Sequence, residues 1–296
     1  VSVIAVCYNH DKFLKQTLNS IIAQKEVNFE LIIIDDFSTD NSRKEIDGWI
    51  QNNIVSIDII KLYNKENLGI CRTINKAMRM ASGTYVKTIA CDDYIYPNAL
   101  KRFLDFSISI NSRFTYSDVQ IIDENDIKMS VDFFSKRKSR PLSGMFYDNL
   151  LKKNFLPAAG FFFRRDIFET VGEYDESLSF EDYDFSLRVQ KMNIPIFYLD
   201  EKLCFYRVHS DNFSNRKSQN RFLHYYDNLK IYKKHLDNPI GFDQYKILLT
   251  RIYKNFQVKK NHFSLEMVPK NSIFRFFYYY RLIPYTLMKI WIEKMK

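Results

Sequence analysis

Short apolar segments rich in β-branched residues alternate with helical patterns through the N-terminal third of the chain, and this alternation constrains the fold most strongly. The pattern predicts strands at residues 1–9, 31–36, 55–63 and 84–90, with amphipathic helices between them. Alternating strands and helices form βαβ units, which build a mostly parallel sheet covered on both faces. We therefore predict an α/β fold with a Rossmann-like central sheet flanked by helices.

Local signals set the expected limits of the helices. Asp11 is placed to cap the first helix, Gly83 to end the third and Pro97 to begin the next. Beyond Pro97 the pattern is less regular, with helices predicted at 164–171 and 181–192. The segments IFYL and LCFYRVH that follow are strand-like.

Polar side chains stand where the predicted strands end. The stretch LIIIDDFSTD places two carboxylates directly after four apolar residues, another strand ends in a second acidic pair, and the first strand is followed by a tyrosine and an asparagine. The carboxyl ends of parallel strands meet at one edge of a sheet, where ligands bind in such folds. We expect one edge to carry six polar residues, namely Tyr8, Asn9, Asp35, Asp36, Asp92 and Asp93.

The two acidic pairs have two possible explanations. Asp and Asn after a strand are common turn formers, because their side chains bond nearby backbone groups. Alternatively, four carboxylates in one place repel one another unless a cation or a donor-rich ligand is present. Mg²⁺ and Mn²⁺ take oxygen ligands, often one or two carboxylates together with substrate phosphates. A divalent cation that holds a diphosphate would fit this edge.

Composition excludes several other classes of site. The chain has only 7 glycines, no GxGxxG after a strand and no GxxxxGK[ST], which argues against ordinary dinucleotide and P-loop binding. Its 4 cysteines form no CxxC pair, so we expect buried free thiols in a reducing compartment rather than a zinc site or a disulfide framework.

Charge is distributed unevenly along the chain. Residues 216–296 contain 17 Lys and Arg against 5 Asp and Glu, a net charge of +12. The remaining 27 basic and 30 acidic residues give residues 1–215 a net charge of −3. This shift, next to the polar run at 210–220, predicts a boundary between two parts of the chain.

Five segments in the same order carry a resemblance to a known family. They are VSVIAVCYN, ELIIIDDFSTDNS, NKENLGICRTINKAMRMASGTYV, ACDDYIYP and GEYDESLSFEDYDFSLRV. Together they resemble the family 2 glycosyltransferases, which have the GT-A fold, and the resemblance covers residues 1–215. It implies a nucleotide-sugar-binding half at 1–97 and an acceptor-binding half at 98–215. The resemblance does not cover residues 216–296, whose composition predicts a basic, aromatic-rich helical extension.

The resemblance implies roles for the residues at the strand ends. It places Tyr8 and Asn9 at the nucleotide, with the Tyr8 ring against the base. It implies that Asp36 bonds the base, usually uracil, because a carboxylate accepts a ring N–H. Asp35 belongs to the same nucleotide-binding set, with a structural role the better expectation. Arg72 could reach the phosphates, although a solvated surface charge is the more common role for such a residue.

The metal motif departs from the family pattern of Asp-any-Asp. This chain has Ala90, Cys91 and Asp92, so the first acid is absent and Asp92 matches the final, metal-binding position. Asp93 could compensate at the nucleotide. His209 stands where the family often has a histidine near the metal and the diphosphate, and imidazole is a ligand for Mn²⁺. A packing role for His209 is the alternative. The implied cofactor is Mn²⁺ or Mg²⁺.

The resemblance also implies a catalytic base. Asp182, in a Glu-Asp pair near the start of a predicted helix, would take the proton of the acceptor hydroxyl as that hydroxyl attacks the anomeric carbon. Attack opposite the leaving nucleoside diphosphate inverts the anomeric centre. A different explanation is that both acids only stabilise the helix dipole.

The C-terminal extension has a segment of its own, at 272–292. This segment is aromatic and basic, and its charges make a membrane-spanning helix a poor prediction. A basic amphipathic segment on an anionic membrane surface fits better. A helix that packs on the enzyme, or a contact in a homo-oligomer, is the alternative.

We therefore expect a glycosyltransferase in the cytoplasm, which could lie peripherally at the cytoplasmic face of the membrane. Its donor would be a nucleotide-sugar, most simply a UDP-sugar, and its acceptor a cell-surface glycan or a lipid-linked oligosaccharide. A nucleic-acid-binding protein that uses the basic extension is one alternative, but it leaves the acidic pairs unexplained, so no nucleic-acid partner is expected. A catalytically inactive relative is another alternative, given Ala90.

Overall fold

The computed structural model describes residues 1–53, 57–210, 212, 219–236, 247 and 251. The chain forms two compact units, one of residues 1–147 and 155–215, the other of residues 148–154 and 216–296. The second unit contains helix α9 (Gln219–Leu236), and the predicted amphipathic segment at 272–292 lies outside the described residues. The predicted division of the first unit at residue 97 stays a prediction.

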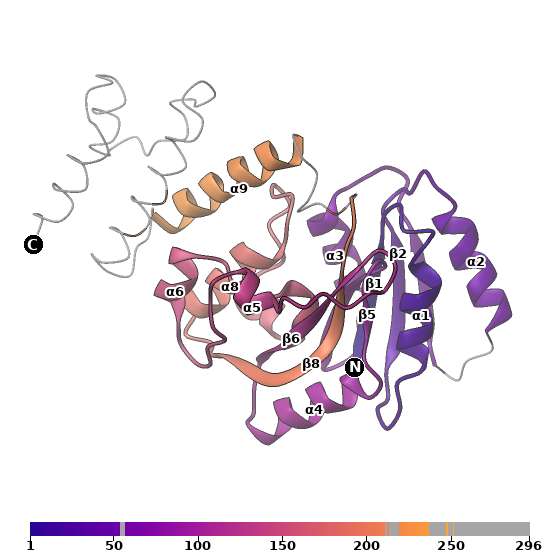
Figure 1. Cartoon of the computed structure of the whole chain (residues 1–296), viewed down its shortest axis with the longest axis horizontal. Coiled ribbons are helices and arrows are strands. Elements are labelled where there is room, and N and C mark those ends of the chain that lie inside the picture. The colour runs from indigo at the N-terminus through magenta and orange to yellow at the C-terminus, as the bar shows by residue number, and fades with distance from the viewer. Residues whose placement is uncertain (54–56, 211, 213–218, 237–246, 248–250, 252–296) are drawn as a thin grey trace, which may run out of the picture. The chain divides into compact units, whose positions relative to one another are not determined.

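One sheet of eight strands forms the centre of the first unit (Figure 1). Its strand order is β3-β2-β1-β4-β7-β6-β8-β5, and the pairs β1–β2, β2–β3, β1–β4 and β6–β8 are parallel. The prediction of an α/β fold with a mostly parallel sheet is confirmed. The strands are β1 (Ser2–Cys7), β2 (Glu30–Asp35), β3 (Ile59–Tyr63), β4 (Tyr85–Ala90), β5 (Tyr94–Ile95), β6 (Phe114–Asp123), β7 (Phe161–Arg164) and β8 (Ile196–Val208).

Helices cover both faces of this sheet. The path from β1 through β2 to β3 runs in one direction and the return to β4 in the other, so right-handed crossovers put α1 and α2 on one face and α3 on the opposite face. Trp49 Nε1 of α2 donates a hydrogen bond to Asn19 Oδ1 of α1 over 2.8 Å. The helices of this unit are α1 (Leu14–Ile22), α2 (Ser42–Asn52), α3 (Ile70–Met78), α4 (Ala99–Ser109), α5 (Phe133–Lys136), α7 (Ile167–Val171) and α8 (Asp182–Lys191), and the residues of α6 (Tyr147–Lys152) are divided between the two units.

The central strands are buried on both faces, which explains their continuous apolar sequences. Every residue of β1 is buried, and in β2 the residues from Leu31 to Asp35 are buried as well. Strands with helices on both sides read as apolar runs rather than as alternating patterns. The sequence therefore identified these strands by composition and length.

Several predicted limits need correction. Asp11 does not cap α1, because Phe13 is the N-cap residue and the Asp11 carboxylate accepts a long hydrogen bond from Asn41 N instead, at 3.4 Å. The helix expected to begin at Pro97 begins at Ala99, after Asn98 with φ +62°. The segments IFYL and LCFYRVH form one continuous strand, β8, because its pairing with β6 absorbs an irregularity in the register beside Asp118.

The ten-residue strand β6 was not predicted, and a close backbone approach explains its mixed sequence. Ser117 in its middle is fully buried, and the short 3₁₀ turn η1 (Ala158–Gly160) lies against it. A Cβ atom added to Gly160 would overlap the Ser117 carbonyl oxygen. Small residues at positions 117 and 160 therefore allow the two backbones to approach each other, which larger apolar side chains would prevent.

We predict opposite effects for two glycine substitutions. Gly160→Ala should lower the free energy of unfolding by about 1–3 kcal/mol, because the new methyl group overlaps backbone that cannot move freely. Gly48→Ala, in the interior of α2 with no atom within 4 Å of the added Cβ, should raise it by about 0.5–1 kcal/mol. Urea unfolding of the two variants checks both signs. Equal stability of the Gly160→Ala variant and the natural chain would contradict the close contact.

Candidate active site

The ends of the first four strands meet at one edge of the sheet. Cys7 pairs with Asp35, Val6 with Ala90 and Asp35 with Tyr63, so the strands end at the same level. The backbone hydrogen bonds from Asp36 N to Cys7 O (2.8 Å) and from Cys91 N to Val6 O (2.8 Å) continue the alignment one residue further. This register brings the residues that follow each strand, among them Tyr8, Asp36 and Asp92, to the same edge.

That edge lies at a topological switch point. The chain moves from β1 outward to β2 and β3, and then returns to β4 on the other side of β1. In open α/β sheets, ligands bind outside the carboxyl ends of the strands at such a reversal of strand order. The position is therefore the expected place for a ligand, independently of the side chains found there.

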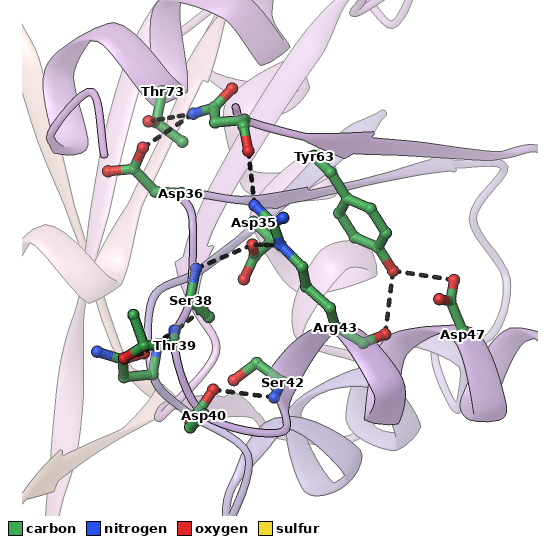
Figure 2. A network of polar contacts seen from close by, with 12 residues as sticks. Asp35, Asp36, Ser38, Thr39, Asp40, Ser42, Arg43, Asp47, Tyr63 and Thr73 are labelled. Carbon is green, nitrogen blue, oxygen red and sulfur yellow. Dashed lines mark hydrogen bonds and ion pairs between the residues drawn. The ribbon is translucent and has the colours of Figure 1, made fainter. Parts of the chain in front are cut away.

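Asp36 is bonded to the loop that precedes α3. Its Oδ1 accepts hydrogen bonds from Asn64 Nδ2 (2.9 Å) and Leu68 N (2.8 Å), and its Oδ2 accepts one from Gly69 N (2.9 Å). Asn64 Nδ2 also donates to Thr73 Oγ1 of α3 over 3.0 Å, a contact drawn beside Asp36 in Figure 2. Gly69 has φ +80°, a backbone conformation that favours glycine.

These bonds hold the Asp36 carboxylate in one orientation and leave it able to accept another donor. A carboxylate has about four lone-pair positions, and Asp36 uses three of them within the chain. The remaining position on Oδ2 is available for a ring N–H of a base. The predicted base contact of Asp36 is therefore compatible with its structural bonds, and it stays a prediction.

Asp35 has the structural surroundings that were expected of it. Its side chain is fully buried, and its Oδ1 accepts hydrogen bonds from Ser38 N (3.1 Å) and Arg43 Nε (2.5 Å), as Figure 2 shows. Arg43 Nη2 donates to Asn64 O over 2.6 Å. Asp35 thereby connects the turn after β2 with α2 and with the end of β3. Its predicted place in the nucleotide-binding set has no direct contact in support and stays a prediction.

Asn9 fixes the end of β1 to the turn after β2. It has φ +59°, its N–H donates to Ser38 Oγ over 2.9 Å, and its Oδ1 accepts a hydrogen bond from Thr39 N over 2.8 Å. The preceding residue, Tyr8, is half-buried at the edge of the sheet. The nucleotide contacts predicted for Tyr8 and Asn9 stay predictions, with Asn9 now also a structural residue.

Asp92 is the centre of a second polar cluster at the same edge. Its Oδ2 lies 3.0 Å from His209 Nε2, 3.2 Å from Asn212 Nδ2 and 3.7 Å from His10 Nε2. Among the described residues its buried Oδ1 has no hydrogen-bond partner. Burial raises the pKa of the Asp92 carboxyl, but His10 and the hydrogen bond from His209 outweigh burial and lower it overall. The structure therefore brings Asp92 and His209 together, and their predicted role as metal ligands stays a prediction.

His10 was missing from the predicted site. Its ring lies 6.4 Å from that of His209 in an edge-to-face arrangement, and its buried Nδ1 has no hydrogen-bond partner within the part of the chain that the structure describes. The signal in the sequence was its place directly after Tyr8 and Asn9, beyond the end of β1. Because β1 and β4 are neighbours, that place puts His10 beside Asp92.

Asp93 has a different environment from its neighbour. Its buried Oδ1 accepts a hydrogen bond from Arg207 N of β8 over 2.8 Å. Burial and then the charge of Asp92 raise the pKa of the Asp93 carboxyl well above its ordinary value. This bond joins the end of β4 to β8. The suggestion that Asp93 replaces the missing first acid of the motif stays a prediction, without a contact in its favour.

Arg207 is fully buried and joins several elements around Asp92. Its Nε donates to Asp92 O (2.8 Å), and its Nη2 donates to Gln16 Oε1 of α1 (2.5 Å) and to Asp126 Oδ1 (2.8 Å). Its guanidinium carbon lies 4.5 Å from the centre of the Phe13 ring. A buried charge is stable only when it is paired and hydrogen-bonded, and these contacts satisfy that condition.

The residues at Asp92 fit a divalent cation in part. Among the described residues, no group of three or more His, Cys, Asp and Glu side chains is arranged to hold a metal ion. Mg²⁺ and Mn²⁺ commonly use one or two protein ligands and complete their coordination with phosphates and water. The buried Oδ1 of Asp92, which lacks a partner in the described chain, and the imidazole of His209 could supply those ligands.

Asp182 is the first residue of α8 and follows Glu181, the N-cap residue. Desolvation, followed by the charge of Asp182, raises the pKa of the Glu181 carboxyl to about 7. Burial, followed by the charges of nearby acids of which Glu181 is the strongest, raises the pKa of the Cys71 thiol of α3. The start of α8 is therefore electrostatically coupled to α3, on the side of the loop held by Asp36. The predicted catalytic role of Asp182 is untested by these contacts.

Arg72 lies on the same helix, α3, and points toward the segment before α8. Its Nε is 3.2 Å from Glu176 Oε2, and both side chains are partly exposed. Asn75 Nδ2 donates to Glu176 Oε1 over 3.2 Å and to Tyr174 O over 2.9 Å. Arg72 thus helps to hold this segment against α3, and the predicted phosphate contact stays a prediction.

The chain is similar in sequence to known glycosyltransferases. A family model described as Glycosyl transferase family 2 matches residues 2–172. The chain is 30% identical over 251 residues to an uncharacterized glycosyltransferase of Methanocaldococcus jannaschii, a match that covers 82% of this chain and 83% of that protein. It is 28% identical over 127 residues to the Escherichia coli UDP-Glc:alpha-D-GlcNAc-diphosphoundecaprenol beta-1,3-glucosyltransferase WfgD, covering 43% of this chain and 48% of the relative.

Solved structures show a similar fold. S. aureus TarS 1–349 in complex with UDP-GlcNAc superposes with a TM-score of 0.66 at 19% identity, covering 92% of this chain and 76% of that one. The mannosyltransferase PcManGT from Pyrobaculum calidifontis, in complex with GDP-Man and Mn²⁺, gives a TM-score of 0.62 at 14% identity, covering 99% of this chain and 82% of that one. At these identities the likeness concerns the fold alone.

We predict a pH-dependent effect of Glu181→Gln on stability. The folded chain holds the Glu181 proton with a pKa of about 7, above the ordinary value of 4.5, so stability should fall as the pH rises from about 4.5 to 7. A neutral glutamine removes this loss. The variant should have a higher melting temperature than the natural chain at pH 8 and the same melting temperature at pH 4.5. A lower melting temperature of the variant at pH 8 would contradict the raised pKa.

Proposed function

The chain belongs to glycosyl transferase family 2 and is a glycosyltransferase, and from this premise we propose its donor, acceptor and chemistry. The donor is a UDP-sugar, and the acceptor is a hydroxyl group of a cell-surface glycan or of a lipid-linked oligosaccharide. Transfer inverts the anomeric centre and depends on Mn²⁺ or Mg²⁺. The enzyme acts at the cytoplasmic face of the membrane.

The observation that carries the proposal is the Asp92 carboxylate at the switch point of the sheet. Its Oδ1 is buried and has no hydrogen-bond partner in the described chain, while His209 and His10 approach its Oδ2. Asp92 and His209 would hold the divalent cation. The cation, when bound, neutralises the charge of the leaving diphosphate. His10 lies beside the same carboxylate and would bring a second imidazole near the phosphates.

The opposite side of the edge would bind the nucleoside. Asp36 has one acceptor position left on Oδ2 and is held rigidly by the loop at 64–69, so it can read a ring N–H of uracil. Tyr8, half-buried at the end of β1, would lie against the base, with Asn9 fixing the backbone beside it. Arg72 would reach the phosphates only if it exchanged its contact with Glu176.

Asp182 would act as the catalytic base. As the acceptor oxygen forms its bond to the anomeric carbon, the bond from that carbon to the phosphate oxygen breaks and the hydroxyl proton moves to the Asp182 carboxylate. With a pKa of about 7, Glu181 carries only part of a negative charge near neutral pH. This limits the repulsion between the two neighbouring carboxylates.

A lipid-linked acceptor is favoured by one relative. The E. coli protein WfgD is named for transfer to a GlcNAc-diphosphoundecaprenol, and this chain resembles it over 127 residues. Within the part of the chain that the structure describes, no helix has the length and apolar character needed to cross a bilayer. An enzyme of this kind would meet such an acceptor by peripheral contact with the membrane.

We predict that UDP compounds stabilise the chain only together with a divalent cation. In a thermal-shift panel, UDP and UDP-sugars with Mn²⁺ should raise the melting temperature by about 5 °C near saturation, and neither component alone should do so. Asp92→Asn should remove most of this shift, because it weakens the ligand set. Equal stabilisation without metal, or stronger stabilisation by GDP than by UDP, would contradict the proposed donor site.

We predict that Asp182→Asn separates catalysis from donor binding. Transfer should fall by about 10²–10⁴-fold, because the amide cannot accept the acceptor proton. The UDP–Mn²⁺ shift in melting temperature should remain. Glu169→Gln, an exposed acid of α7, serves as the control and should retain transfer. Near-normal turnover of the Asp182→Asn variant would remove Asp182 from the mechanism.

A further inference from the structure

Residues 127–140 form an exposed apolar and basic surface, which begins directly after Asp126 beside the candidate active site. Its apolar part contains Ile127, Met129 and Val131, which are exposed to 64%, 40% and 45%. Lys128 pairs in a short bridge with Ile122 of β6, so Ile127 and Met129 on either side of it point in the same direction. Exposed apolar side chains on neighbouring positions indicate a contact with a partner more strongly than scattered ones do.

The same surface carries a concentrated positive charge. Residues 127–140 contain five basic residues and one acidic residue, a net charge of +4, within residues 1–215 whose net charge is −3. The acid, Asp132, caps α5 by accepting hydrogen bonds from Ser135 N (2.8 Å) and Ser135 Oγ (2.8 Å). The basic side chains are all exposed: Lys136, Arg137, Lys138 and Arg140 around the end of α5, and Lys128, which points to the side opposite Ile127 and Met129.

The packing of α5 gives these charges a fixed position. Phe133 and Phe134 are buried, and the Phe134 ring lies 5.8 Å from that of Tyr198 on β8 in an edge-to-face contact. The short helix is therefore attached to the sheet by its aromatic residues, while the lysines and arginines around its end remain at the surface.

The surface is also connected to the Asp92 cluster. Asp126, which directly precedes Ile127, accepts hydrogen bonds from Arg207 Nη2 (2.8 Å) and Gln16 Nε2 (3.2 Å). Arg207 in turn donates to Asp92 O over 2.8 Å. The start of the 127–140 segment is therefore tied to the Asp92 cluster, whereas α5 lies near the other end of β8, at Tyr198.

We propose that the 127–140 surface binds an anionic lipid membrane. The basic and the apolar side chains of the surface suit different regions of one membrane leaflet. Basic side chains are attracted to the anionic headgroups, and exposed apolar side chains enter the acyl-chain region beneath them. An acidic polymer would pair with the charges but would leave Ile127 and Met129 without a role. The evidence for the proposal is the charge and the exposure of these residues. Its biological purpose rests on the lipid-linked acceptor of the proposed function.

The test is co-sedimentation of the full chain with vesicles of phosphatidylglycerol and phosphatidylethanolamine, with phosphatidylcholine vesicles for comparison. The natural chain should bind the anionic vesicles. The double variant Lys136→Gln, Lys138→Gln should bind about tenfold more weakly, because each lysine near an anionic membrane surface contributes to the free energy of binding. Ile127→Ser with Met129→Ser should weaken binding to a similar extent.

Matched controls come from the same unit. Lys25→Gln with Lys44→Gln removes two exposed lysines elsewhere, and Met80→Ser with Ile108→Ser removes two side chains exposed to 48% and 61%. Both controls should bind as the natural chain does, and melting curves should show all variants folded. Unchanged binding of the 127–140 variants would overturn the proposal, as would equal losses in the controls.

A further outcome distinguishes an acidic polymer from a membrane. If soluble polyphosphate displaced the chain completely and the Ile127 and Met129 variant bound like the natural chain, the surface would bind polyanions and the membrane proposal would be wrong. No nucleotide or acceptor is present in the assay. A negative result in the vesicle assay therefore leaves the donor and catalytic predictions standing. Negative results for those predictions likewise leave the proposed membrane contact standing.

Discussion

The arrangement of the site depends on the hydrogen bonds made by the buried guanidinium of Arg207. It belongs to β8 in the second half of the first unit, yet it donates to Asp92 O at the end of β4 and to Gln16 of α1. It also holds Asp126, the residue that leads into the 127–140 surface. A buried charge without its partners lowers the stability of the fold. Loss of one of these contacts is therefore expected to weaken the packing of β4, α1 and β8 around Arg207.

The two adjacent acids that end β2 show how one strand end can serve two purposes. Successive side chains of a strand point to opposite sides, so Asp35 and Asp36 meet different neighbours. Asp35 bonds Arg43 and supports the turn into α2, whereas Asp36 bonds the loop before α3. The first gives the edge its rigidity, and the second presents a carboxylate of fixed direction.

The sequence predicted the parts of the fold that depend on local pattern. β1, β2 and β4 are short apolar runs between helix signals, and their order alone placed Asp36 and Asp92 at one edge. It did not reveal β6, because the buried Ser117 interrupts its pattern, nor His10 and Arg207. Those two residues act through neighbours distant in the chain, such as Asp92, and pairing of that kind leaves no periodic signal.

The margin of the sheet has a consequence for association between copies of the chain. β5, at one end of the strand order, consists of Tyr94 and Ile95 only, and β3, at the other end, carries Lys61 in an ion pair with Asp47. A charged side chain on an outer strand disfavours pairing with an incoming strand. Self-assembly by continuing the sheet into a second molecule is thus discouraged on the β3 side.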